Sequence, residues 1–264
     1  MKNNIKEFDA EPFDLTKILN SVQSFSLLNS SQEKVLVILG ATATGKSSLA
    51  VKLAEFLGTE IISADSMSVY KNFNIGTAKP TAQELKKVRH HLINILEPEE
   101  KFSVAEFVSR AEKIITEINL CGKIPVVVGG TGLYIQALIE GYKFKTDSKS
   151  QEKIFSDTGK LKYNALVIGL TANRQKLYER INKRTKEMFD AGLVEEVQTL
   201  LNSGVSPNAQ AMLGIGYKET VEFLQGAATF DETISKVSQA TRNFAKRQLT
   251  WYRRMNYIKF FNVE

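Results

Sequence analysis

The octapeptide GATATGKS, at Gly40–Ser47, is the most informative stretch of this chain. An unbroken apolar run at residues 35–39 (VLVIL) comes directly before it. Apolar residues at helical spacing follow it and stop at Gly58. A short buried strand, a glycine-bounded loop and an amphipathic helix form the context of a phosphate-binding loop. The spacing of Gly40, Gly45, Lys46 and Ser47 fits the P-loop template in full.

Such a loop surrounds phosphate oxygens with the backbone N–H groups of the loop and of the helix N-terminus. Lys46 is expected to reach a terminal phosphate, and the Ser47 hydroxyl to hold a Mg²⁺ ion. The alternative is a glycine-rich turn that binds nothing, but the complete template favours a phosphorylated ligand. The predicted phosphate-binding residues are Gly40, Ala41, Thr42, Ala43, Thr44, Gly45, Lys46 and Ser47.

From Val35 onward, strand and helix patterns alternate along the chain. Strands are predicted at 35–39, 60–64, 124–128, 165–170 and 257–262, and helices at 46–57, 103–120, 131–140, 174–202, 210–224 and 231–254. This alternation predicts an α/β fold with a P-loop NTPase-like parallel sheet flanked by helices, and with further helices at the C-terminus.

The expected domain organisation is one P-loop domain with a small appendage. Residues 1–34 are interpreted as a partly disordered N-terminal appendage that contains one short amphipathic helix, and residues 35–264 as the P-loop domain. The polar, weakly periodic segment 142–162 breaks the pattern and is expected to cross the surface or to be poorly ordered.

Composition narrows the class of protein. With 43% hydrophobic residues the chain can bury a sizeable core, and its single cysteine, Cys121, permits neither an internal disulfide nor a thiolate zinc site. No apolar run approaches the ~20 residues that span a bilayer. A monomeric, cytoplasmic protein without membrane contact is therefore expected. The net charge of +6 is mild evidence for a polyanionic partner.

Two further segments end predicted strands. Asp65-Ser66-Met67-Ser68 follows residues 60–64, at the strand end where open α/β sheets place ligand chemistry. Its carboxylate can act as a general base or bind Mg²⁺ through water, and the alternative is a turn-capping Asp. Thr131 follows Gly129 and Gly130, where it can donate to a phosphate or substrate or simply cap the next helix.

Localised charge and the two histidines give weaker signals. Arg242, Lys246 and Arg253 fall on one side of the last predicted helix, with Arg247 and Arg254 beside them. A second basic cluster occupies 174–186. Either cluster can be a solvated helix face or a contact for nucleic-acid phosphates. Adjacent His90 and His91 point in different directions and make a poor metal chelate.

Taken together, these segments resemble the bacterial tRNA dimethylallyltransferases. The resemblance rests on GATATGKSSLA, IISADSMSVYKNFNIGTAKPT, HHLINI, VVVGGTGLYIQALIEG, RINKRTKEMFDAGLVEEV, GIGYKE and TRNFAKRQLTWYR, which occur in the family's order. It implies transfer of a dimethylallyl group from dimethylallyl diphosphate to N6 of adenosine 37 in tRNA, with Mg²⁺ as cofactor.

The resemblance also implies roles for individual residues. The P-loop would grip the leaving diphosphate, with Lys46 as a catalytic group. Asp65 would take the proton from N6, and Thr131 would line the channel where the substrates meet. The residues implied to contact tRNA are Asp65, Ser66, Met67, Ser68, Thr131, Arg242, Lys246 and Arg247.

This sequence departs from the family pattern in three places. The helical insertion that usually follows ALIEG is missing, because only residues 142–162 join Gly141 to the next strand. The Arg expected shortly after Asp147 is also missing. Ser68 and Asn94 replace a frequent Gln and a frequent Asp. The catalytic core is therefore predicted to be intact, and the part that grips the anticodon stem-loop to be shortened.

Three alternatives remain open. The missing insertion motivates an adenylate isopentenyltransferase that acts on free AMP or ATP. The P-loop alone is equally typical of a small-molecule kinase or NTPase. A degenerate, non-catalytic relative that still binds tRNA or diphosphate is the third alternative.

Overall fold

A computed structural model describes residues 9–144, 153–154 and 160–264 of the chain. Its centre is a seven-stranded sheet, in the order β1-β9-β8-β2-β5-β3-β4, in which every pairing is parallel. The strands are β1 (Ala10–Pro12), β2 (Lys34–Gly40), β3 (Ile61–Ser63), β4 (His90–His91), β5 (Val126–Gly129), β8 (Asn164–Thr171) and β9 (Lys259–Asn262).

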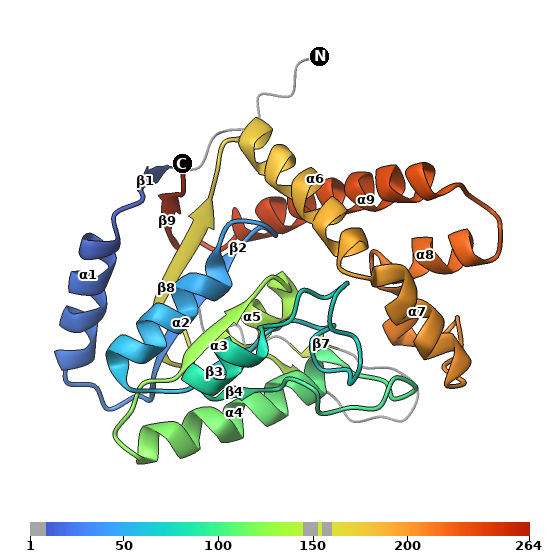
Figure 1. The fold of residues 1–264 in the computed structure, drawn as a ribbon. Coiled ribbons are helices and arrows are strands. Elements are labelled where there is room, and N and C mark those ends of the chain that lie inside the picture. The colour runs from blue at the N-terminus through green and yellow to red at the C-terminus, as the bar shows by residue number, and fades with distance from the viewer. Residues whose placement is uncertain (1–8, 145–152, 155–159) are drawn as a thin grey trace.

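Helices cover both faces of this sheet (Figure 1). They are α1 (Leu15–Leu27), α2 (Lys46–Leu57), α3 (Ala82–Lys87), α4 (Val104–Leu120), α5 (Gly132–Ile139), α6 (Arg174–Asp190), α7 (Leu193–Asn202), α8 (Tyr217–Leu224) and α9 (Phe230–Tyr252). Helices α6 to α9 group together beside the end of the sheet toward which β8 points (Figure 1). The predicted α/β parallel-sheet class with C-terminal helices is confirmed.

Both faces of strand β2 are buried. Side chains alternate between the two faces of a strand. Leu36 and Ile38 join one apolar cluster with α1 and α2, and Val37 and Leu39 join the other with α4 and α5. An uninterrupted apolar run is therefore what a central parallel strand requires.

Two predicted helices are wrong in their continuity. The helix predicted at 174–202 is divided into α6 and α7, because Gly192 adopts a φ of 97°. The helix predicted at 210–224 is a short 3₁₀ turn, Gln210–Leu213, followed by α8, with Gly216 at a φ of 95° between them. Positive φ values of this kind end a helix and suit glycine.

Residues 10–27 add an edge strand to the sheet and a helix that packs against it. Strand β1 pairs in parallel with β9, and Pro12 lies on this sheet edge, where a missing N–H costs no ladder hydrogen bond. Helix α1, capped by Asp14, buries Ile18 and Val22 against the cluster that contains Phe261. Part of the predicted appendage thus belongs to the main core, while the predicted disorder of residues 1–8 lies outside the described residues.

The segment predicted as a surface crossing, 142–162, is described in part. It contains the short antiparallel pair β6 (Lys143–Phe144) and β7 (Lys153–Ile154). Residues 145–152 and 155–159 lie outside the described residues. Among the helices that the structure describes, none is long and apolar enough to cross a membrane.

Candidate active site

The P-loop connects β2 to the N-terminus of α2, as the sequence predicts. Gly40 must be glycine, because a Cβ there would lie 2.7 Å from the carbonyl oxygen of Leu170. Ala43 and Gly45 take positive φ values of 64° and 84°, which turn the loop into the helix. The Thr44 hydroxyl donates to the carbonyl of Ala41 at 2.8 Å and closes the loop on itself.

Lys46 and Ser47 open helix α2. The half-buried Lys46 ammonium donates to the carbonyl of Ala41 at 3.3 Å. Burial lowers the pKa of Lys46 to about 8; nearby Asp65 opposes that shift and the Arg184 guanidinium adds to it. Ser47 is exposed at the helix N-terminus, where the helix dipole favours an anion.

Asp65 lies two residues beyond the end of β3. In the sheet, β5 separates β3 from β2, the strand that leads into the P-loop. Its Oδ1 accepts hydrogen bonds from the backbone N–H groups of Met67 and Ser68, at 2.8 and 3.2 Å. These two bonds fix the carboxylate at the start of a turn. Asp65 therefore does cap a turn, as the alternative interpretation holds. Its carboxylate also interacts with Lys46 and Arg184, where its negative charge opposes the lowering of their pKa values by burial.

Thr131 joins the Asp65 segment from the neighbouring strand β5. Its Oγ1 accepts from the backbone N–H of Ser66 at 3.3 Å and lies 3.5 Å from the Ser66 hydroxyl. Although Thr131 occupies the N-cap position of α5, its side chain makes no capping bond to that helix. The predicted Thr131 and Asp65–Ser68 segments are thus brought together.

The sequence prediction missed two buried residues of α9. Gln248 accepts from the Thr42 N–H at 2.9 Å and donates to the Gly130 carbonyl at 2.8 Å. The Tyr252 hydroxyl donates to the same carbonyl at 2.9 Å. Burial raises the pKa of Tyr252, so its hydroxyl stays protonated as a donor. A glutamine in an otherwise basic and aromatic motif was the available signal.

Arg184 of α6 was assigned only to a basic cluster. The structure turns it inward, with Nη1 donating to the Thr42 hydroxyl at 3.4 Å. Burial lowers the pKa of Arg184 from its usual value. Its spacing was the available signal, because it lies three residues after buried Ile181 and seven after buried Leu177, on the buried stripe of α6.

Loop 74–79 is held by α7 and carries Lys79, which interacts electrostatically with Asp65. The Glu196 carboxylate of α7 accepts from the N–H groups of Asn74 and Ile75 at 3.0 and 2.9 Å, and from the Tyr217 hydroxyl at 2.7 Å. Lys79 donates to the Tyr70 carbonyl and, at 2.6 Å, to Asn94. Burial lowers the pKa of Lys79 to about 8.

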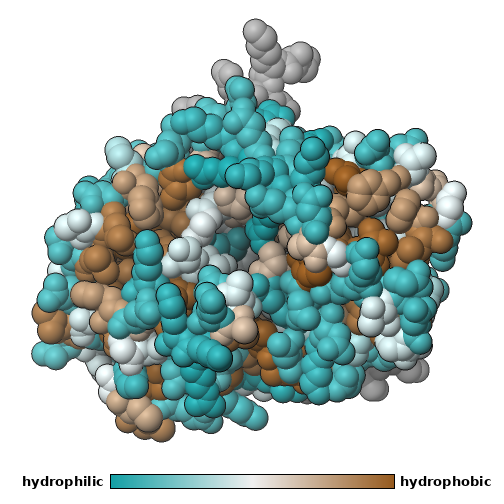
Figure 2. All heavy atoms as spheres, viewed as in Figure 1, coloured by the Kyte–Doolittle hydropathy of each residue, from teal (hydrophilic) through white to brown (hydrophobic). Residues whose placement is uncertain are grey.

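The two basic clusters form one surface across α6 and α9. Arg242 of α9 donates to Asn182 of α6 at 2.5 Å and lies over the ring of Tyr178, which Arg174 also contacts. Lys246 and Arg247 are exposed on the same helix. Figure 2 shows hydrophilic residues over the region that α6 occupies in Figure 1, above a hollow in the surface.

The remaining candidates do not extend the site. The His90 Nδ1 donates to the Val88 carbonyl at 2.8 Å, and His91 pairs with Glu60 at 2.5 Å. In the part of the chain that the structure describes, no group of three His, Cys, Asp or Glu residues can hold a metal ion.

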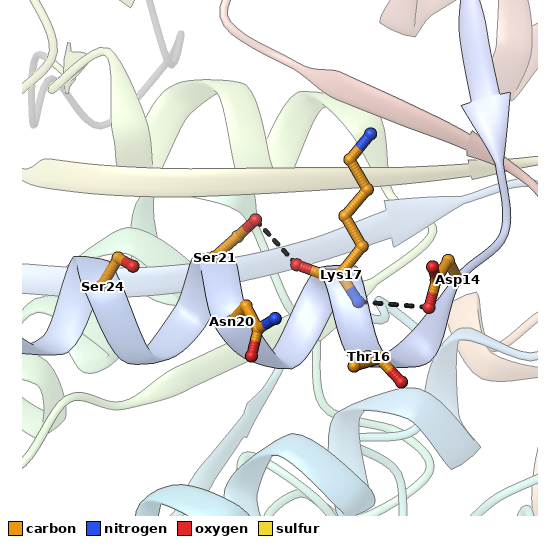
Figure 3. Close-up of a pocket in the computed structure, with 6 residues that line it drawn as sticks. All are labelled: Asp14, Thr16, Lys17, Asn20, Ser21 and Ser24. Carbon is orange, nitrogen blue, oxygen red and sulfur yellow. Dashed lines mark hydrogen bonds between the residues drawn. The ribbon is translucent and has the colours of Figure 1, made fainter.

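Two further pockets lie beside α1 and beside the P-loop. The pocket in Figure 3 lies on the polar face of α1, where Asp14 caps the Lys17 N–H and Ser21 donates to the Lys17 carbonyl. The polar side chains of Asp14 and Ser21 are therefore already used by the helix. Another pocket borders the outer side of the P-loop, between Gly45, Lys52 and Arg180.

A P-loop between β2 and α2 of a fully parallel sheet, with polar segments at the ends of β3 and β5, defines an α/β protein of the P-loop class. The model of the IPP transferase family matches residues 68–160 and 147–255. A tRNA dimethylallyltransferase of Carboxydothermus hydrogenoformans is 41% identical, over 87% of this chain and 92% of the relative. One of Pelotomaculum thermopropionicum is 38% identical, over 88% and 92%.

Solved structures similar to this fold include proteins of the same kind as these sequence relatives. The full-length tRNA isopentenylpyrophosphate transferase of Bacillus halodurans superposes with a TM-score of 0.79 at 37% identity, covering 88% of this chain and 90% of that one. A eukaryotic dimethylallyltransferase acting on tRNA superposes with a TM-score of 0.76 at 25% identity, covering 88% of this chain and 74% of that one. The chain belongs to the IPP transferase family.

The comparisons also bear on the shortened segment. The alignment with the Pelotomaculum relative runs over 288 positions but includes only 88% of this 264-residue chain. That relative therefore carries residues with no counterpart here. The two matches to the family model overlap at residues 147–160, within the segment 142–162.

Proposed function

We propose that this chain transfers a dimethylallyl group from dimethylallyl diphosphate to N6 of adenosine 37 in tRNA and releases diphosphate. The proposal is carried by one observation: the P-loop and the Asp65–Ser68 and Thr131 segments meet at the carboxyl ends of the parallel strands. This arrangement places an anion-binding loop beside a fixed carboxylate, which is what an allylic transfer to an amine requires.

Cleavage of the allylic C–O bond leaves its electron pair on the diphosphate. The loop N–H groups, Lys46 and Arg184 supply positive charge where that negative charge develops. In proteins, Mg²⁺ is commonly held by one or two side chains together with substrate phosphates and water. Exposed Ser47 at the start of α2 fits this role, and bound Mg²⁺ would supply further neutralisation of the leaving group.

Asp65 is the proposed general base. As N6 forms its bond to the allylic carbon, the proton leaving N6 passes to the Asp65 carboxylate. The hydrogen bonds from Met67 and Ser68 hold Oδ1 in place during this step. An exocyclic adenine amine is a weak nucleophile, so a positioned base contributes about 10²–10⁴-fold.

The tRNA substrate is proposed to lie along the α6–α9 surface, with Arg242, Lys246 and Arg247 toward its phosphates. Asp65, Ser66, Met67, Ser68 and Thr131 would then contact the target nucleotide after it leaves its stack. We further infer a cytoplasmic monomer, consistent with its charge and single cysteine.

A second acceptor is favoured by one observation. By the family resemblance, the segment that is shortened around residues 147–160 is the one that would grip a stem-loop, and a free adenylate needs no such grip. AMP is therefore the alternative acceptor at the same site.

The deciding experiment supplies labelled dimethylallyl diphosphate and Mg²⁺ to the full chain. Parallel reactions receive unmodified tRNA with adenosine at position 37, the same tRNA with that base replaced, or AMP. Label in the first tRNA alone is the expected result. Label in AMP alone would reassign the acceptor, and phosphate transfer from ATP without prenylation would replace the proposal with a kinase.

A further inference from the structure

Helix α9 passes unusually close to the turn that carries Thr131. A Cβ at Gly130 would lie 2.4 Å from Nε2 of Gln248, and a Cβ at Gly132 would lie 2.6 Å from Cδ1 of Trp251. Both distances are shorter than real Cβ contacts, so a side chain at either position would force Gln248 or Trp251 to shift. Gln248, Trp251 and Tyr252 are spaced three and four residues apart, which places them on one face of the helix.

The Gln248 side chain has two opposite tasks in this contact. Its oxygen accepts from the Thr42 N–H of the P-loop, and its nitrogen donates to the Gly130 carbonyl of the neighbouring turn. The residue is 4% exposed, so water cannot replace either bond. An amide offers an acceptor and a donor at once at every pH, whereas a carboxyl group of the same length does so only when it is protonated.

The two tied segments hold different halves of the site. Thr42 belongs to the loop that faces the diphosphate and also contacts Arg184. Gly130 immediately precedes Thr131, whose hydroxyl contacts Ser66 beside Asp65. The Tyr252 hydroxyl donates to the same Gly130 carbonyl, so that this turn is held by two bonds from α9.

We propose that Gln248 is a positioning residue that sets the spacing between the P-loop and the Thr131 turn, and thereby aligns the leaving diphosphate with the attacking amine. The inference rests on the proposed transfer reaction and assigns Gln248 a role that acts through Thr42 and Gly130. Alignment of reacting groups is sensitive to small displacements, and a shift of about 1 Å can cost about 10²-fold in rate.

The test compares Gln248→Met with wild type in the full chain. Met matches the length of Gln but cannot make both hydrogen bonds. We expect kcat to fall about 10–100-fold, with the KM for tRNA and for dimethylallyl diphosphate within about threefold of wild type. Gln198→Met, an exposed glutamine on α7, is the matched control and should retain wild-type kcat.

Calorimetric titration with inorganic pyrophosphate and Mg²⁺ separates alignment from folding. Full binding stoichiometry in Gln248→Met, with the loss in kcat, supports the positioning role. A loss of binding sites in proportion to the loss of kcat would show a merely structural role and overturn it.

Gln248→Glu supplies a chemical rescue. A protonated carboxyl group can accept from Thr42 and donate to Gly130, whereas a carboxylate cannot donate. The activity of this variant relative to wild type should therefore rise as the pH is lowered from 8 to 6. A flat ratio would contradict the proposal. If wild type transfers no prenyl group to any acceptor, the proposed function fails; if wild type is active and Gln248→Met equals it, only this inference fails.

Discussion

At the scale of single residues, the site depends on charges held near one another. Lys46, Arg184 and Asp65 interact electrostatically, and burial rather than pairing dominates the pKa shifts of both cations. Burial lowers both pKa values because it removes the cations from water, which disfavours their charged forms. A bound anion would restore that stabilisation. The site is thus prepared for a ligand with several negative charges.

Asp65→Asn tests the proposed base. The amide keeps an oxygen that can accept from the Met67 and Ser68 N–H groups, so that the turn should persist. We expect kcat to fall about 10²–10⁴-fold while pyrophosphate binding is retained. Rapid-quench measurement of prenyl transfer checks the rate. Normal tRNA modification by this variant would show that another group takes the proton.

The pKa of Lys46 predicts how diphosphate binding depends on pH. The free protein loses the Lys46 proton near pH 8, and a bound anion requires the charged form and raises its pKa. The contribution of Lys46 to affinity is therefore complete below pH 8 and is lost as the pH rises through 8. Affinity for pyrophosphate should fall about tenfold between pH 7 and pH 9.

Lys46→Arg is the control for this measurement, because a guanidinium stays charged over the whole range. It also leaves Lys79, whose pKa is lowered to about 8 as well, unchanged. Titration calorimetry at both pH values should show a flatter profile for the variant. The same fall in the two proteins would place the titrating group elsewhere.

At the scale of elements, the sequence predicted what local pattern controls. The P-loop, Asp65 and Thr131 could be placed together because each follows a parallel strand, and the carboxyl ends of parallel strands lie on the same side of the sheet. Gln248 and Arg184 could not be placed, because their partners at Thr42 are 206 and 142 residues away along the chain. The division of α6 from α7 depends on the φ of Gly192, which helical periodicity does not reveal.

Helix α1 gives a prediction at this scale. Ile18 is fully buried against the core that contains β2 and β9. Ile18→Ala should lower the free energy of unfolding by about 2–5 kcal/mol, as expected for a large-to-small change in a core. Urea denaturation measures this directly. Ser24→Ala, on the exposed face of the same helix, should change it by less than about 0.5 kcal/mol. Equal effects would mean that α1 adds nothing to the main core.

At the scale of the whole molecule, the net charge of +6 becomes informative because part of it is concentrated on α6 and α9. Sequence alone could not decide whether these basic clusters are separate solvated faces. The crossing of the two helices, with Arg242 reaching Asn182, joins them into one surface next to the site.

Lys246→Ala and Arg247→Ala test this surface. Each should weaken tRNA binding and lower the slope of log affinity against log salt by about 1, because one phosphate contact is lost. Lys236→Ala is the control, since Lys236 lies on the same helix but pairs with Glu222 at 3.2 Å. Filter binding at several salt concentrations provides the data. An unchanged slope in both test variants would place tRNA elsewhere.

The pairing of β1 with β9 has a consequence for how the chain is made. Residues 10–12 find their sheet partner only at residues 260–262. On a ribosome, β1 emerges long before β9 and must wait until residues 260–262 have been synthesised. Contacts so distant in sequence form late and slowly. One edge of the sheet and the docking of α1 are therefore expected to be the last steps of maturation, after the P-loop has formed.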